Sequence, residues 1–361
     1  TIYSTDVGIK PGEENSNGDI NFSGGVKVRY FRCLNSNTAN IIKVHISRDM
    51  RLAIRDELES FDIIHLHEYR SFPNIYIWYY ATKYKIPYVL QAHGSSPLII
   101  GRQKKIFTIL KKIFDTIVGR KIINCSSKLI ALNKEEIEQY TKLGADKHKI
   151  EIIPNGINIT DFDVMPDKGD FRKMHGIERN TKVILFLGRI NKNKGIDLLL
   201  NAYSELIKEL PNTLLLVVGP DDGYLLKAQK LAKRLGISHN VLFTGPMYGL
   251  NKIKAYIDAD VYVLPSYYEI YGITALEAVA CGTPTIVTTR CGIINYLYSY
   301  VYTVDYDVYQ LKNAILLLLS NYSYVDNKCK AKELKSYSWH NIAIKFEHIY
   351  KEIIRSCRDF N

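Results

Sequence analysis

A basic loop flanked by glycines is the first candidate for chemistry in this sequence. Residues 188–195 place Arg189 and Lys194 after an apolar run that predicts a strand and before a stretch of helical period. Two cations and the backbone amides of a helix start are groups that bind a diphosphate. Taken alone, the same segment is equally well interpreted as a solvated basic loop.

Two glutamates eight positions apart form the second candidate. Glu269 is expected in the loop after a strand and Glu277 inside the helix that follows, with Gly272 and Ile273 at the helix start. The amides of a helix start carry partial positive charge. This order of groups fits a sugar, a phosphate and a ribose in succession. The alternative is a capping carboxylate followed by an exposed helical glutamate.

Three weaker signals lie in the first half of the chain. His93 follows an apolar run at the end of a predicted strand, where it could donate to a substrate hydroxyl. A histidine satisfied within a strand-end turn is an equally good interpretation. His65 and His67 alternate onto one face of a strand, and packing is expected there rather than metal binding. Asn155 and Gly156 are a turn signal to which the sequence assigns no chemical role.

A parallel sheet would bring such residues together. Short β-branched runs alternate with stretches of helical period over residues 27–157, and the pattern resumes after a polar linker region, 160–180. In open α/β sheets, ligands bind beyond the carboxyl ends of the strands. We predict an N-terminal domain (1–157), a second domain (158–335) and a C-terminal helix (336–361) that packs back across the cleft. The strands expected in the second domain are 183–187, 214–218, 241–244, 261–264 and 285–288.

The composition narrows the function classes. A chain of 361 residues is long enough for two domains. The six cysteines include no Cys-x-x-Cys pair, which favours reduced thiols in a cytosolic protein over a zinc site or disulfides. A net charge of +11 predicts an acidic partner, such as a phosphorylated small molecule, an anionic membrane surface or nucleic acid. The sequence contains no recognisable nucleic-acid module, so we expect no nucleic-acid partner.

Taken in order, these segments resemble the family 4 (group 1) glycosyltransferases, and residues 266–288 are the most specific part of the match. The resemblance implies a GT-B fold of the α/β class, with two Rossmann-like doubly wound domains facing across a cleft.

Two features of the sequence depart from the family pattern. The family's first strand and glycine-rich loop have no counterpart, because residues 23–25 precede a strand. Either the sequence is a fragment, which we expect, or the protein is catalytically impaired. Residues 291–295 lack the second glycine and the acidic residue that many relatives have.

The resemblance also implies roles for the candidate residues. Gly188, Arg189 and Lys194 would hold the diphosphate of the donor, and Glu277 its ribose. Glu269 and the backbone of Gly272 and Ile273 would hold the transferred sugar, which His93 would touch from the other domain. The turn at Asn155 and Gly156 also matches a family segment near the cleft, without an assigned chemical role. The reaction would be retaining transfer of a hexose-type sugar from a UDP- or GDP-linked donor, with no cofactor and no metal. A phosphorylase or epimerase of the same fold, and a non-catalytic nucleotide-sugar-binding protein, remain open.

A basic amphipathic segment suggests where the acceptor lies. Residues 101–121 carry apolar side chains at helical spacing beside a dense positive charge. This helix is expected either to rest on an anionic membrane surface or to pack on the N-terminal sheet, and both are possible if Phe107 and Phe114 remain outside. In the family such a surface accompanies lipid-linked acceptors, which implies a cytoplasmic enzyme at the inner face of a membrane, acting on a glycan or lipid-linked acceptor. The apolar residues are Ile106, Ile109, Leu110, Ile113 and Ile117, and the cations are Arg102, Lys104, Lys105, Lys111 and Lys112.

Overall fold

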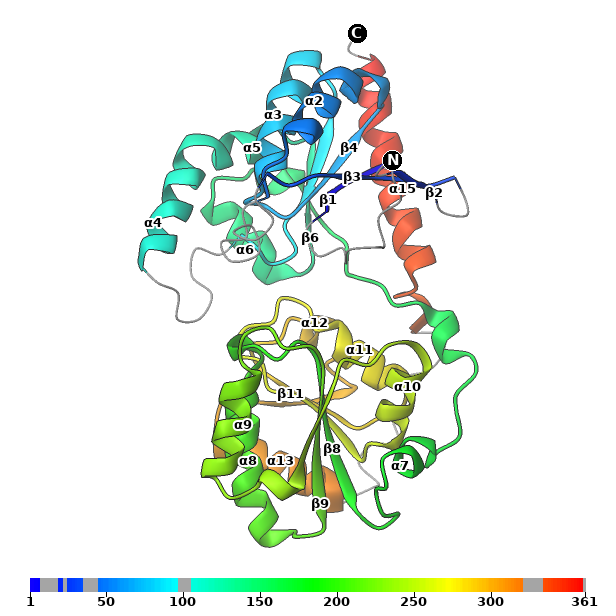
Figure 1. Cartoon of the computed structure of the whole chain (residues 1–361). Helices are drawn as coiled ribbons and strands as arrows, with labels where there is room; N and C mark the ends of the chain where they lie inside the picture. Colours follow the sequence, from blue (N-terminus) through cyan, green and yellow to red (C-terminus); the bar gives the residue numbers. More distant parts are fainter. Residues whose placement is uncertain (7–18, 22–24, 35–44, 97–104, 321–333, 360–361) are drawn as a thin grey trace. The chain divides into compact units, whose positions relative to one another are not determined.

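The computed structural model describes residues 1–6, 19–21, 25–34, 45–96, 105–320 and 334–359 (Figure 1). The chain divides into two compact units. Unit 1 comprises Thr1–Leu98, Lys104–Ile152 and Glu347–Asn361, and unit 2 comprises Ile99–Gln103 and Ile153–Phe346. The last helix, α15 (Trp339–Asp359), contributes residues to both units. Each unit is built on parallel strands, which confirms the predicted α/β class with two parallel-sheet domains.

Unit 2 contains a six-stranded parallel sheet in the order β10-β9-β8-β11-β12-β13. The strand order reverses between β8 and β11, which are neighbours although β9 and β10 lie between them in the chain. The five predicted strands are present, but β13 was missed because it is a half-exposed edge strand within a tyrosine-rich segment that shows no continuous apolar run. The strands are β8 (Lys182–Leu187), β9 (Thr213–Val218), β10 (Val241–Gly245), β11 (Val261–Leu264), β12 (Thr285–Thr288) and β13 (Val301–Val304).

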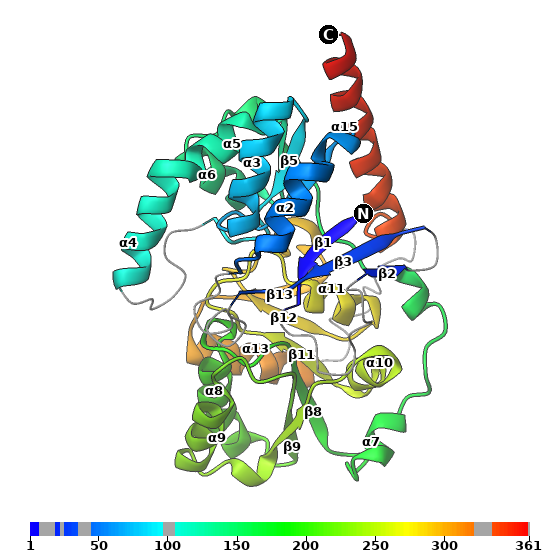
Figure 2. The ribbon, with the colours of Figure 1, turned by 45° about the horizontal axis from the view of Figure 1, so that its top comes forward.

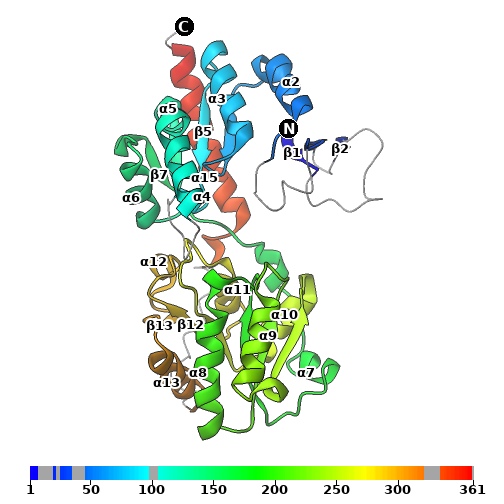
Figure 3. The same ribbon diagram turned by 60° about the vertical axis from the view of Figure 1, so that its left-hand side comes forward.

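Helices cover both faces of this sheet, as Figures 1 and 3 show. On one face, Val261 and Val263 of β11 join the core formed with α8 (Ile196–Glu209), α9 (Leu225–Arg234) and α13 (Val308–Ser320). On the other face, Tyr262 packs on Tyr256 of α10 (Gly249–Asp258) and donates a hydrogen bond to Thr274 of α11 (Ile273–Ala280). The alternation of side chains along each strand therefore supplies both layers.

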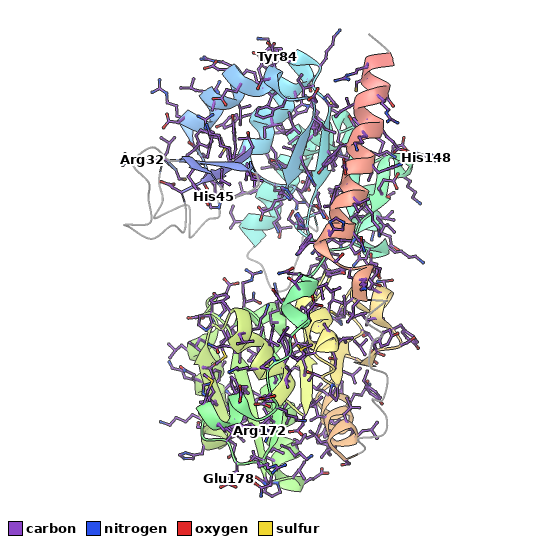
Figure 4. All side chains as sticks on the ribbon, turned by 90° about the vertical axis from the view of Figure 1, so that its right-hand side faces the viewer. Arg32, His45, Tyr84, His148, Arg172 and Glu178 are labelled. Atoms are coloured by element: carbon purple, nitrogen blue, oxygen red, sulfur yellow. The ribbon has the colours of Figure 1, made fainter. Side chains whose placement is uncertain are left out.

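The region predicted as a linker, 160–180, is instead folded onto unit 2. It holds a short 3₁₀ helix (Ile159–Phe162) and α7 (Asp170–Met174). Arg172 of α7, labelled in Figure 4, is 8% exposed and donates to Asp260 Oδ2 at 2.8 Å and to Thr181 O at 2.7 Å. A buried arginine held in this way explains why so polar a segment is ordered.

Unit 1 contains a four-stranded parallel sheet, in the order β4-β5-β6-β7, and a three-stranded sheet, in the order β1-β3-β2. The strands are β1 (Ile2–Thr5), β2 (Asp19–Asn21), β3 (Lys27–Phe31), β4 (Ile64–His67), β5 (Tyr88–Gln91), β6 (Lys128–Ala131) and β7 (Ile150–Ile152). Residues 23 and 24 of the segment before β3 lie outside the described residues, and Gly25 leads into that strand as predicted.

In the described part of unit 1, four helices contribute fully buried side chains to the core beside the four-stranded sheet, and Figure 2 shows α2, α3 and α5 on one side. They are α2 (Arg48–Glu57), α3 (Phe72–Tyr84), α5 (Arg120–Cys125) and α6 (Lys134–Lys142). Ile54, Ala81 and Ile123 join Leu66 and Leu90 in the core of this unit. Ahead of α5, α4 (Lys105–Phe114) and a π-helical turn (Asp115–Gly119) run into one another without a break. Among the described residues, no helix has both the length and the apolar character needed to cross a membrane.

Candidate functional site

The loops after β8 and β11 meet where the strand order of unit 2 reverses, the place where open α/β sheets bind ligands. Gly195 has a φ of 69°, and a Cβ on it would overlap the carbonyl oxygen of Pro265. A Cβ on Gly219, after β9, would overlap the carbonyl oxygen of Gly188. Tyr267 N donates to Asn193 O at 2.8 Å. Main-chain contact therefore sets the spacing of these loops.

Lys194 and Glu269 form an ion pair across the two loops. Their side chains are 18% and 14% exposed, so the pair is largely shielded from water but can still be reached. Lys194 sits in a 3₁₀ turn (Lys192–Lys194) that the Asn191 side chain caps, and its backbone position is therefore fixed. The predicted diphosphate cation and the predicted sugar carboxylate thus lie together and neutralise each other.

Arg189 takes a different partner from Lys194. Its Nη1 lies 3.0 Å from Asp222 Oδ2, in the loop after β9, and Asn191 Nδ2 donates to the same oxygen at 2.9 Å. The arginine side chain is 62% exposed. A single exposed ion pair contributes little stability, about 0–1 kcal/mol, so Arg189 can exchange Asp222 for a bound anion at small cost.

Glu277 lies inside α11, the helix that follows the loop carrying Glu269, as the sequence predicted. Its Oε1 is 2.7 Å from Lys252 Nζ, and its Oε2 accepts from the Tyr256 hydroxyl at 3.0 Å. Burial is the main cause that raises the pKa of Tyr256 well above its usual range, so that hydroxyl remains a donor. Each carboxylate oxygen can accept a second hydrogen bond, which leaves Glu277 able to bind a ribose hydroxyl.

The start of α11 supplies backbone donors beside Glu269. Gly272 precedes the helix with a φ of 95°, and a Cβ there would lie 2.8 Å from Cys291 Sγ, so glycine is required by both conformation and space. Ile273 is the first helical residue, and the first amides of a helix have no intrahelical acceptor. The predicted positions of Gly272 and Ile273 at a helix start are confirmed.

The turn at Asn155 and Gly156 contacts the loop that leads into α11. Asn155 O accepts a hydrogen bond of 2.8 Å from the hydroxyl of Tyr271, the residue before Gly272. A Cβ on Gly156 would lie 2.9 Å from the backbone nitrogen of Trp339, so only glycine allows the chain to pass there. This contact gives the turn a structural role that the sequence could not supply.

His93 lies in unit 1, two residues after β5, with a left-handed φ of 50°. Its Nε2 is 2.8 Å from His67 Nδ1, at the end of the neighbouring strand β4. His65, on the same strand, stacks on His67 and lies 2.6 Å from the Tyr350 hydroxyl. Burial and the neighbouring histidines lower the pKa of His65 to about 3, and loss of hydration with the nearby His67 lowers the pKa of His93 to about 4. These rings are therefore neutral at pH 7.

Three residues near the candidate site were missed by the sequence reasoning. Lys252 and Tyr256 lie four positions apart on α10, a spacing that places both on one helix face, and this face meets Glu277. Asp222 follows β9 and so lies at the same edge of the sheet as Arg189. Within the described part of the chain, no group of three or more histidine, cysteine, aspartate or glutamate side chains is placed to hold a metal ion.

Both halves of the chain match known protein families. A family model described as glycosyl transferases group 1 matches residues 167–335, and a model of glycosyltransferase family 4 matches residues 4–161. An uncharacterised glycosyltransferase of Methanocaldococcus jannaschii is 30% identical over 309 residues, which cover 81% of this chain and 76% of that protein. A D-inositol 3-phosphate glycosyltransferase of Corynebacterium jeikeium is 31% identical over 253 residues, 66% of this chain and 58% of the relative.

Solved structures share the fold. Sucrose-phosphate synthase of Thermosynechococcus elongatus superposes with a TM-score of 0.73 at 20% identity, covering 95% of this chain and 87% of the other. Anabaena HepE, solved in complex with UDP and glucose, gives a TM-score of 0.73 at 16% identity, covering 90% and 86%. At these identities the likeness establishes the two-domain architecture of these enzymes.

Proposed function

Because this chain belongs to the group 1, family 4 glycosyltransferases, we propose that it moves a hexose-type sugar from a UDP- or GDP-linked donor to an acceptor, with retention of anomeric configuration. The observation that carries the proposal is the shielded pair of Lys194 and Glu269, held beside the start of α11 at the strand-order reversal of unit 2. A cation, a carboxylate and helix-start amides are the groups that a sugar diphosphate needs.

The residues suggest how the diphosphate would leave. The bond from the anomeric carbon to the diphosphate breaks while the acceptor oxygen bonds to the same face of that carbon, and a phosphate oxygen takes the acceptor's proton. Negative charge on the departing diphosphate would be stabilised by Lys194, Arg189 and the amides near Ile273, preorganised donors that need no metal. Glu269 would be released from Lys194 to bind the sugar hydroxyls, while Glu277 holds the ribose. His93 would donate to or accept from a hydroxyl of the same sugar.

Binding of UDP and UDP-glucose to variants of the two glutamates tests this proposal. In the wild type, either ligand at a hundred times its dissociation constant should raise the free energy of unfolding by about 2.7 kcal/mol. EDTA is present throughout, because the proposed site needs no metal. Glu277→Ala should weaken both ligands, because both carry the ribose. Glu269→Ala should weaken UDP-glucose and spare UDP. Calorimetry measures the four affinities, and the same measurements with GDP and GDP-mannose decide the nucleotide.

Glu205→Ala is the matched control, since Glu205 is a half-exposed glutamate of α8 that pairs along its own helix with Lys208. It should leave both affinities unchanged. The assigned roles are wrong if Glu269→Ala weakens free UDP as much as Glu277→Ala does. A ligand that binds only when a divalent metal is added would contradict the metal-free site.

We further propose that the acceptor is presented at an anionic membrane surface, because of how α4 lies. Ile106, Ile109, Leu110 and Ile113 are 48–55% exposed, and Ile117, in the π-helical turn, is 59% exposed. The inward positions of this helical segment are taken instead by Phe114, which packs edge-on against Tyr69, and by other side chains of the unit 1 core.

The apolar stripe of this segment therefore faces outward, and the alternative in which it packs on the sheet is wrong for these residues. Lys112, Arg120 and Lys121 are exposed beside it. The side chains of Lys105 and Phe107, and residues 102 and 104, lie outside the described residues. An exposed apolar stripe with flanking cations is complementary to an anionic bilayer, at which each cation contributes about 1 kcal/mol.

Vesicle sedimentation at low salt checks the membrane proposal. The wild type should sediment with vesicles that contain anionic lipid and stay in the supernatant with neutral ones. The double variant Ile109→Asp with Ile113→Asp should lose this binding, and Lys112→Glu should weaken it. Leu226→Asp, which changes a 63% exposed leucine of α9, should behave as the wild type. Equal binding to both kinds of vesicle would contradict the role of the cations, and no binding to either would point to a soluble glycan acceptor.

A further inference from the structure

A hydrogen bond joins two histidines at the ends of neighbouring strands in unit 1. β4 and β5 run parallel, and His67 is in register with Gln91, two residues before His93. His67 Nδ1 lies 2.8 Å from His93 Nε2, and the rings are nearly parallel, with centroids 5.1 Å apart and planes inclined by 11°. The bond therefore fixes the orientation of one ring relative to the other.

The backbone around His93 is also fixed. The amide of the preceding residue donates to the Tyr140 hydroxyl at 2.7 Å, and the amide of the following residue donates to Glu136 Oε1 at 2.6 Å. Glu136 and Tyr140 are both fully buried. With the main chain held on both sides, the freedom that remains to His93 is rotation of its own side chain, and His67 restricts that rotation.

His67 is supported in turn. The ring of His65 stacks on it with centroids 4.4 Å apart, and His65 Nδ1 lies 2.6 Å from the hydroxyl of Tyr350 on α15. Glu68, directly after His67, is one of three non-glycine residues with positive φ in the described chain, and His93 is another. Left-handed backbone at non-glycine residues persists only where the surroundings hold it.

We propose that His67 is a positioning residue for His93: its Nδ1 holds His93 Nε2, so that His93 meets a sugar hydroxyl through Nδ1. The proposal rests on the proposed function, in which His93 contacts the transferred sugar. In a neutral imidazole one nitrogen donates and the other accepts, and the bond made by the first sets the role of the second. His67 therefore decides whether His93 offers a proton or a lone pair to the substrate.

Imidazole ¹⁵N NMR combined with steady-state kinetics tests this role. In the wild type, His93 should show a single fixed tautomer. His67→Phe keeps an aromatic ring but removes the nitrogen that bonds to His93, so the His93 signals should average between exchanging tautomers. Turnover should fall about tenfold to a hundredfold, the loss expected for a misoriented contact, while the KM for the donor stays within about twofold. His67→Asn keeps a polar group near the Nδ1 position and should restore both the fixed tautomer and most of the turnover.

Tyr79→Phe is the control, because it removes the hydroxyl of a 56% exposed tyrosine of α3 that has no part in the contacts described above, and it should leave the His93 signals and turnover as in the wild type. Unchanged His93 signals in His67→Phe would overturn the proposal, and so would an Asn variant as impaired as the Phe variant. The NMR result needs no substrate. A protein without transferase activity would therefore refute the proposed function, while the ring signals alone would still decide the role of His67.

Discussion

Lys194→Ala is expected to lower turnover by about a hundredfold or more, which is the loss typical of one preorganised donor to transition-state charge. The lysine side chain is only 18% exposed and is held by a capped turn, so no solvent cation can replace it without reorganisation. The variant also leaves Glu269 without its partner. Arg189→Ala should lose turnover to a similar degree, because the proposed function assigns this second cation to the same diphosphate. Initial rates at saturating donor measure both effects.

Lys192→Ala is the control for this pair, since Lys192 is an exposed lysine of the same turn. Its turnover should stay within about twofold of the wild type, as is usual for a rim charge away from the chemistry. Near-normal turnover in both Lys194→Ala and Arg189→Ala would show that the loop after β8 does not hold the leaving group.

Arg172→Leu is expected to destabilise unit 2 by about 3–5 kcal/mol, the usual loss when one member of a buried ion pair is removed. The guanidinium of Arg172 pairs with Asp260 at 2.8 Å and also donates to backbone oxygens, including Asp258 O at 3.0 Å. Leucine fills part of the volume but satisfies none of these acceptors. Hydrogen exchange of the β8 and β11 amides, which lie in unit 2, should accelerate by about a hundredfold or more.

Lys173→Leu changes the next residue of α7, whose side chain is exposed, and should leave the exchange rates of β8 and β11 unchanged. If the β8 and β11 amides of Arg172→Leu exchange as slowly as those of this control, the hydrogen bonds of Arg172 contribute nothing to the stability of unit 2.

Much of the fold could be predicted from periodicity because it depends on patterns that are local in the chain. The apolar runs at β8 and β11 are buried along their length. The glycines after these strands mark where the backbone turns toward the next helix. The positions of Glu269 before α11 and Glu277 inside it could be predicted from the same pattern of apolar runs and glycines. Helix α7 was not predicted because its stability depends on a distant partner, the contact of Arg172 with Asp260, and β13 was not predicted because it is a half-exposed edge strand without a continuous apolar run.

Pairing between candidate side chains could not be predicted in the same way. Lys194 and Glu269 are 75 positions apart, and their contact depends on the strand order, which places β11 next to β8. His67 and His93 were each noted, yet their bond depends on the register of β4 against β5. Sequence periodicity assigns a residue to a face or a strand end, whereas partners are chosen by topology and register.

The glycine contacts between the loops of unit 2 have a consequence for how such a site changes over evolutionary time. Gly195 lies against the main chain of Pro265, and Gly219 against the main chain of Gly188. Inserting or deleting a residue in these loops would break these contacts, whereas exchanging an exposed side chain such as Arg189 would not. New substrate preferences can therefore arise by single substitutions on a scaffold of constant loop length, and a mutational library aimed at altered donor use should vary side chains and keep loop lengths fixed.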